Sequence, residues 1–196
     1  RAQSAGLKKD FRSEITTQPA CLMLRSVNIE GACVTEKKPY NDCIFTTEQV
    51  CKTRGGKFNA RILCSNTALN TRCLPQETTS CTKDEQGEDA VYWFDSCGNK
   101  ENIYDFNTKA KLRQEGKAVP SYQSCQLPSP TDPSFKEKQK TCGNCAPLLG
   151  SICGTKTNQE HLVDSTSGFV CKDATCIDEN GKKRENYESW CRYQGA

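Results

Sequence analysis

Cysteine is the residue whose number and spacing could carry the most chemistry in this chain. There are 15 cysteines among 196 residues, and a thiol can form a disulfide, ligate a metal or act as a nucleophile. Zinc sites combine close cysteine pairs with one another or with histidines. The chain has one such pair, Cys142 and Cys145, and one histidine, His161. The spacing therefore predicts disulfides, with no metal site and no cofactor.

We expect the cysteines to form a disulfide framework, in which an odd number leaves at least one thiol without a partner in the chain. The set is Cys21, Cys33, Cys43, Cys51, Cys64, Cys73, Cys81, Cys97, Cys125, Cys142, Cys145, Cys153, Cys171, Cys176 and Cys191. The odd thiol is expected most simply among the nine of the N-terminal half, where it is free or bonded outside the segment. Spacing alone leaves the pairing open.

Cys142 and Cys145 have the spacing of a thiol–disulfide oxidoreductase site. Such a site needs a thiolate at the start of a helix within a βαβ arrangement. Ala146 and Pro147 follow at once, and no βαβ pattern surrounds the motif. We therefore expect both thiols to be structural.

The other polar residues form no recognisable catalytic or cation site. A Ser-His-Asp or Cys-His site would have to use His161, whose neighbours form no nucleophile motif. Asp173, Asp178 and Asn180 could offer oxygens to calcium, but the twelve-residue ligand loop with its glycine and closing glutamate is absent. A turn is the better interpretation of these residues, and the sequence predicts that the chain is not an enzyme.

Apolar and aromatic side chains are the candidates for binding a partner. Trp93 and Trp190 lie among other aromatics and could form a platform for carbohydrate or protein. In disulfide-rich domains such residues more often cover the bridges as a small core. Near the N-terminus, Leu7, Phe11 and Ile15 recur at intervals of four in a segment without cysteine. We expect that segment to be an arm that docks onto a neighbouring copy, as in strand addition.

The amino-acid composition explains why disulfides are needed. Leu, Ile, Val and Phe make up 32 of the 196 residues, about 16%, which is below the ~20% under which chains often fail to fold. Ordering the backbone costs about 1–2 kcal/mol per residue, whereas a bridge that closes ~15 residues contributes about 3 kcal/mol. Disulfides can thus supply what a thin core cannot, and such scaffolds are typical of secreted and cell-surface proteins.

Charge and hydropathy exclude several classes of partner. The 27 basic and 24 acidic residues give a net charge of +3, which is too small to indicate nucleic acid or an anionic membrane surface. No apolar run approaches the ~18 residues of a membrane span. No Asn-X-Ser/Thr sequon occurs, so a glycoprotein would have to carry O-linked glycans on Thr/Ser-rich stretches.

Cysteine use and composition divide the chain into four zones. We expect an N-terminal arm (1–20), a first cysteine-rich domain (21–125), a proline-containing linker (126–140) and a second cysteine-rich domain (141–196). The predicted fold class is small and disulfide-rich, mainly β with irregular loops, one or two short helices and two subdomains. Disulfides replace long regular elements in such folds.

Local patterns predict individual elements in both halves. Residues 46–54 should form a short helix with a Thr N-cap and a Gly-Gly stop. Residues 91–94 should form a strand that enters a turn at Cys97-Gly98-Asn99, with a second strand at 103–106 beside it. In the C-terminal half we expect a strand at 168–171, a turn at Asn180-Gly181, and a return strand at 187–193.

Residues 31–64 carry a regular cysteine pattern, made of Gly31-Ala32-Cys33, Cys43, Thr46-Thr47-Glu48-Gln49-Val50-Cys51, Gly55-Gly56-Lys57-Phe58 and Cys64. This pattern resembles a short cysteine module of bacterial and other microbial secreted proteins. The family often has a doubled cysteine where this chain has only Cys33. The segment from Cys171 to Cys191 is similar to cysteine-rich surface proteins of archaea. These resemblances imply extracellular placement and a modular, often repeated, architecture, and they imply no activity.

Together these features favour an extracellular structural or adhesive protein. It would be a matrix-like component, or a subunit of a filament or surface layer held by disulfides and by the N-terminal arm. Its expected partners are other copies or other surface proteins, and carbohydrate is a further candidate. The alternative is a secreted binding module, such as a ligand, an inhibitor or a lectin-like protein, that uses exposed loops or aromatic residues.

Overall fold

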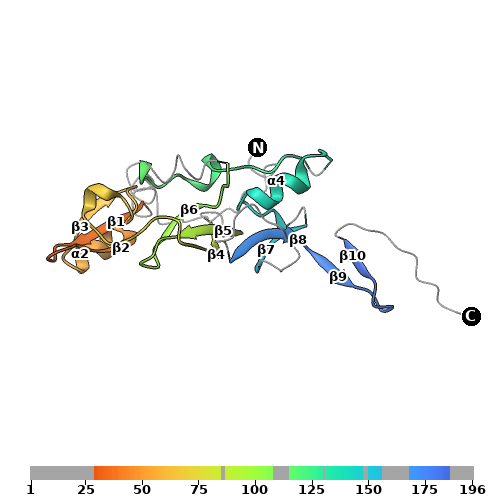
Figure 1. Cartoon of the computed structure of the whole chain (residues 1–196), viewed down its shortest axis with the longest axis horizontal. Coiled ribbons are helices and arrows are strands. Elements are labelled where there is room, and N and C mark those ends of the chain that lie inside the picture. The colour runs from red at the N-terminus through yellow and green to blue at the C-terminus, as the bar shows by residue number, and fades with distance from the viewer. Residues whose placement is uncertain are drawn as a thin grey trace, which may run out of the picture. The chain divides into compact units, whose positions relative to one another are not determined.

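A computed structural model describes residues 29–84, 87–107, 115–129, 131–147, 150–155 and 168–185 of the chain. These residues form two compact units, which we call unit 1 and unit 2. Unit 1 contains the described residues up to Pro75 together with Asp95–Asn99 and Glu115–Ala118, and unit 2 contains the other described residues. Within them, small sheets, irregular loops and two short α-helices make the fold mainly β (Figure 1), which confirms the predicted fold class.

Unit 1 is built on a three-stranded antiparallel sheet in the order β2-β1-β3 (Figure 1). The strands are β1 (Glu30–Thr35), β2 (Asp42–Thr47) and β3 (Lys57–Ala60). The central strand β1 buries Ala32 and Val34, which pack with Cys64 and Cys73. Two of these four core residues are cysteines, so the disulfides themselves fill much of the interior.

Helix α2 (Glu48–Thr53) follows β2, as the sequence predicts for residues 46–54. Thr47 occupies the N-cap position, although its side chain makes no capping hydrogen bond. Gly55, with φ of +68°, lies just past the helix end in the left-handed conformation that glycine favours. Cys51 is the buried position of the helix, and its bond to Cys33 fastens α2 to strand β1.

Unit 2 is organised around β5, the central strand of a second antiparallel sheet. The strands are β4 (Thr78–Lys83), β5 (Asp89–Phe94) and β6 (Lys100–Ile103), in the order β4-β5-β6 (Figure 1). β5 is buried on both faces, because Tyr92 packs with Ile103 in one cluster and Trp93 packs with Tyr104 in another. A strand covered on both faces has no polar side, which explains the unbroken apolar run of Val91–Phe94.

A helix and two hairpins complete unit 2. They are α4 (Phe135–Thr141), β7 (Ser151–Thr155) with β8 (Phe169–Asp173), and β9 (Thr175–Ile177) with β10 (Lys183–Glu185). Single 3₁₀ turns occupy Thr67–Leu69 in unit 1 and Ser121–Gln123 in unit 2. The expected strand at 168–171 is therefore present in β8.

The C-terminal hairpin differs from its prediction at the return strand. The Asn180-Gly181 turn is present, with Gly181 at φ of +77°. Because this turn is tight, the chain pairs with β9 directly after it, at Lys183–Glu185, so the return strand begins earlier than the predicted 187–193. Residues 187–193 lie outside the described residues.

The two units are interleaved along the chain. Residues 95–99 and 115–118 belong to unit 1, although they lie between segments of unit 2. The zone interpreted as a linker, 126–140, includes most of helix α4, in which Phe135 and Gln139 are buried. Its prolines precede the helix, and the residues after them are good helix formers. The predicted arm, 1–20, lies outside the described residues.

Candidate functional site

Twelve of the thirteen cysteines in the described residues form six disulfides, which confirms the role predicted for these twelve. The pairs are Cys33–Cys51, Cys43–Cys64 and Cys73–Cys97 in unit 1, and Cys81–Cys153, Cys125–Cys142 and Cys145–Cys171 in unit 2. Cys176, on β9, is a free and exposed cysteine rather than a bridged one. Cys21 and Cys191 lie outside the described residues.

The CxxC motif is structural, as predicted. Cys142 bonds to Cys125 and Cys145 bonds to Cys171. Because each sulfur is engaged with a different partner, the two cannot form the reversible intramotif disulfide on which a thiol–disulfide oxidoreductase depends.

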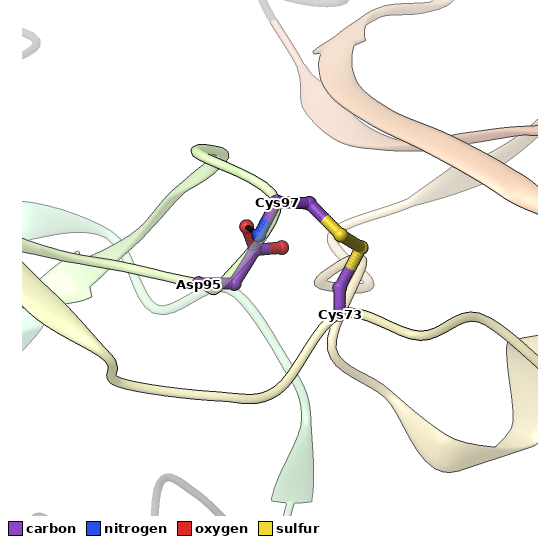
Figure 2. A group of neighbouring side chains, drawn as sticks. All are labelled: Cys73, Asp95 and Cys97. Atoms are coloured by element: carbon purple, nitrogen blue, oxygen red, sulfur yellow. Dashed lines mark hydrogen bonds between the residues drawn. A yellow bond between two sulfur atoms is a disulfide. The ribbon is translucent and has the colours of Figure 1, made fainter.

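One group in the described part of the chain has the composition of a metal site: Cys73, Asp95 and Cys97, whose potential ligand atoms lie within 4.8 Å of one another. Figure 2 shows that the two sulfurs are bonded to each other, with the Asp95 carboxylate beside Cys97. A cysteine ligates a metal as a thiolate, so this bonded pair does not fit a metal ion. The group is the closure of a turn rather than a metal centre.

Asp95 organises that turn through both carboxylate oxygens. Its Oδ1 accepts hydrogen bonds from the backbone N–H of Cys97 at 2.9 Å and of Asn99 at 2.8 Å. Its Oδ2 accepts from Nδ2 of Asn99 at 2.9 Å. Asn99, thus oriented, accepts the backbone N–H of Phe45 on β2 through its Oδ1 at 2.9 Å. A carboxylate that is only 3% exposed therefore links the turn to the sheet of unit 1.

Unit 1 has a concave surface of about 560 Å³ with charged and aromatic side chains in its lining. Its charged and aromatic lining consists of Lys37, Lys38, Tyr40, Asp42 and Arg72. Three cations face one carboxylate, so the surface is cationic at neutral pH. Lys37 pairs with Asp42 at 3.0 Å, and within the described residues neither Lys38 nor Arg72 forms an ion pair.

Arg72 is ordered by the ring of Tyr40. Its guanidinium lies over the ring, 4.5 Å from the centroid, which is the geometry of a cation–π contact. The Tyr40 side chain remains 43% exposed. A guanidinium that stacks through its face keeps its N–H edge available for a planar or tetrahedral anion.

Asn41 holds the two segments that carry this pair. Its backbone N–H donates to the carbonyl of Asn70 at 2.9 Å, and its Nδ2 donates to the carbonyl of Leu69 at 2.8 Å. Nδ2 of Asn70 donates back to the carbonyl of Pro39 at 3.3 Å. The loop before β2 and the loop before Cys73 are thus joined on either side of the concave surface.

Of the five predicted partner-binding residues, one is described by the structure, and its predicted role is corrected. Trp93 is 0% exposed and packs against Tyr104, with ring centroids 5.1 Å apart. It is a core residue and cannot present a platform, because both faces of β5 are covered. Leu7, Phe11, Ile15 and Trp190 lie outside the described residues.

The turn between β9 and β10 is organised by Asp178 as a hydrogen-bond acceptor. Its Oδ1 accepts the backbone N–H of Asn180 and of Lys182, each at 2.9 Å. Its Oδ2 accepts Nε–H of Arg184 at 2.8 Å, and the Asp178 side chain is 2% exposed. The Lys182 backbone hydrogen bond, supported by Arg184 and Asn180, holds the pKa of the Asp178 carboxyl below its usual value.

Sequence reasoning did not find the concave surface. Tyr40 and Arg72 are far apart in the chain, and neither belongs to a motif. They meet because the hydrogen bonds of Asn41 and Asn70 join their segments. Contacts between loops that lie far apart in the chain leave no local pattern, so no signal in the sequence joined the two residues.

The chain matches no protein-family model, no curated protein and no solved structure. The class of protein is therefore assigned from the structure alone. The chain is a small disulfide-rich protein, mainly β, with two compact units. Six disulfides are consistent with an extracellular location. In the residues that the structure describes, no helix has the length and apolar character needed to cross a bilayer.

Proposed function

We propose that the chain is an extracellular structural or adhesive protein, a component of a filament, matrix or surface layer. The observation that supports this most strongly is the density of cross-links, three disulfides in each unit of short strands. Sheets of two or three short strands bury little surface and are marginal by themselves. Covalent bridges make such units resistant to unfolding and proteolysis, which a durable protein outside the cell requires. The proposal includes no catalytic step.

Association of copies is the finer part of this proposal. One chain cannot pair all of its 15 cysteines internally, and Cys176 is exposed on β9 next to Ile177, whose side chain is 75% exposed. An exposed strand with an exposed thiol and an apolar neighbour suits a contact between copies. In this proposal the N-terminal arm, with Leu7, Phe11 and Ile15, provides a second contact.

Sedimentation of native protein, with thiols blocked before handling, tests this proposal. We expect covalent multimers that dissociate on mild reduction, and a fall in the multimer fraction to less than about one fifth in Cys176→Ser. Thr175→Ala, which changes the adjacent exposed residue, is the matched control and should assemble as the parent does. A strictly monomeric parent at high concentration would overturn the assembly role.

The alternative function is a secreted binding module, and the concave surface around Tyr40 and Arg72 favours it. That function requires a monomer with a saturable partner. It is separated from the structural role by measuring association of the chain with itself and with a ligand independently. The two roles meet in an adhesive protein, which needs both durability and a binding surface.

A further inference from the structure

We propose that the concave surface around Tyr40 and Arg72 is a binding site for an acidic saccharide, recognised through a carboxylate or sulfate group. The inference deepens the adhesive part of the proposed function and rests on its extracellular placement. It does not depend on self-assembly.

The size and charge of the concave surface suit a small anionic ligand. A volume of about 560 Å³ lies within the ~300–1,000 Å³ of small-ligand sites. Lys37 is neutralised by Asp42 at 3.0 Å, which leaves Lys38 and Arg72 as the cations available to a ligand. Two positive groups on one concave surface favour an anion.

The Arg72–Tyr40 contact places a fork of N–H donors beside an aromatic ring. With the guanidinium held 4.5 Å from the ring centroid, its N–H groups form a fork that matches two oxygens of one carboxylate or sulfate. Tyr40 is 43% exposed, and its aromatic side chain provides an apolar surface beside that fork. A saccharide that carries an acidic group presents the same combination, an anion next to the C–H face of a ring.

The two loops that form the site are held in place before a ligand binds. The hydrogen bonds of Asn41 and Asn70 join the two loops, and Cys43–Cys64 and Cys73–Cys97 follow them directly in sequence. Because both loops are already fixed, binding orders few groups and costs little conformational entropy. A site fixed in this way discriminates between ligands by geometry as well as by charge.

The lining favours a saccharide over an acidic protein segment. Apart from Pro39 and Ile44, the lining side chains are charged, amide or aromatic, or belong to half-cystines. Peptide sites depend on pockets for buried aromatic or aliphatic anchors. Instead, the ammonium group of Lys37 and the carboxylate of Asp42 lie side by side and provide a donor and an acceptor suited to hydroxyl groups.

Calorimetric titration of the full chain tests the site with three probes: a sulfated heparin-derived oligosaccharide, an oligogalacturonate and neutral maltohexaose. We expect one or both acidic probes to bind at low salt, the neutral probe to give no signal, and the affinity to fall as salt rises. The two acidic probes distinguish sulfate from carboxylate. No binding of either acidic probe at low salt would overturn the proposal.

Three arginine variants separate a site from diffuse charge. We expect Arg72→Ala to weaken binding at least tenfold, and Arg72→Lys to weaken it about fivefold, because lysine keeps the charge but lacks the fork. Arg54→Ala removes an exposed arginine outside the surface and should change affinity less than twofold. Equal losses in Arg72→Ala and Arg54→Ala would contradict the site, and thermal melts confirm that each variant is folded.

Sedimentation of the same variants distinguishes this site from the assembly role. If Arg72→Ala abolishes self-association and leaves saccharide binding intact, the occupant is an acidic segment of a second copy, and the saccharide proposal fails. If a monomeric parent binds saccharide and Arg72→Ala does not, the site stands and the filament role fails. If the parent forms multimers and binds no acidic probe, the saccharide site fails and the assembly role stands.

Discussion

Asp95 is a buried carboxylate with a structural role, although together with Cys73 and Cys97 it has the composition of a metal site. It lies beside a disulfide in a group that resembles a metal site, yet its oxygens accept three hydrogen bonds from Cys97 and Asn99. A buried acceptor that satisfies this many donors is costly to lose, since each donor left without a partner costs about 1–3 kcal/mol. The residue is therefore a determinant of the fold of unit 1.

We expect Asp95→Ala to lower the free energy of unfolding by about 3 kcal/mol, because it removes three partly buried hydrogen bonds of about 1 kcal/mol each. Asp95→Asn is the matched control and should cost less, since its Oδ1 can still accept the two backbone N–H groups. Urea denaturation with all disulfides intact measures both. Equal stability of Asp95→Ala and the parent would contradict the role assigned to the carboxylate.

At the scale of elements, β5 is held by the backbone of the CxxC motif. The N–H of Gly143 donates to the carbonyl of Tyr104 at 2.6 Å, and its carbonyl accepts the N–H of Val91 at 2.8 Å. Gly143 thus lies against β5 and the residue after β6, and its missing side chain permits the approach, since a Cβ there would overlap the Val91 carbonyl. The two disulfides on either side hold this segment in place.

We expect Gly143→Ala to destabilise unit 2 by about 3 kcal/mol, the upper part of the range for overpacking a tight site. Gly168→Ala is the matched control, because a Cβ at Gly168 meets only the Thr79 carbonyl at an ordinary 3.8 Å, and it should change stability by less than about 0.5 kcal/mol. Hydrogen exchange of the Val91 and Tyr92 amides reports the loss. Similar exchange rates in the two variants would show that the close approach is not needed.

Local elements were predictable from sequence, whereas their partners were not. Gly55 and Asn180-Gly181 indicated where a helix ends and a hairpin turns, because glycine conformation is a local property. For Trp93 the sequence favoured a place in a small core over a platform, and Trp93 is buried. Which residues cover it depends on segments far away in sequence. The concave surface depends in the same way on contacts between distant loops.

At the scale of the whole molecule, covalent closure dominates stability. Cys81–Cys153 spans 72 residues and joins β4 to β7 within unit 2. In the chain-entropy model a bridge across a loop of this size contributes about 4 kcal/mol, which is comparable to the total stability of many small domains. Because the cores consist partly of half-cystines, few apolar contacts remain to compensate for the loss of this bridge.

We expect the double variant Cys81→Ser, Cys153→Ser to lose about 4 kcal/mol of unfolding free energy through the larger entropy of its unfolded chain. Cys176→Ser also exchanges sulfur for oxygen but breaks none of the six bridges, and it should leave stability unchanged. Thermal and guanidinium unfolding of the oxidised proteins measure the difference. A loss below about 1 kcal/mol in the double variant would contradict this account.

The pairing pattern has a consequence for how the chain must be made. Of the six bridges, only Cys125–Cys142 joins cysteines that are neighbours in the sequence; each of the other five skips at least one. An oxidase that joins thiols in the order in which they emerge from a ribosome or translocon would produce mispaired chains. Correct pairing then requires reshuffling, which is slow without catalysis. Correct pairing should therefore be reached faster in a cell, or an expression host, that supplies a disulfide isomerase as well as an oxidant.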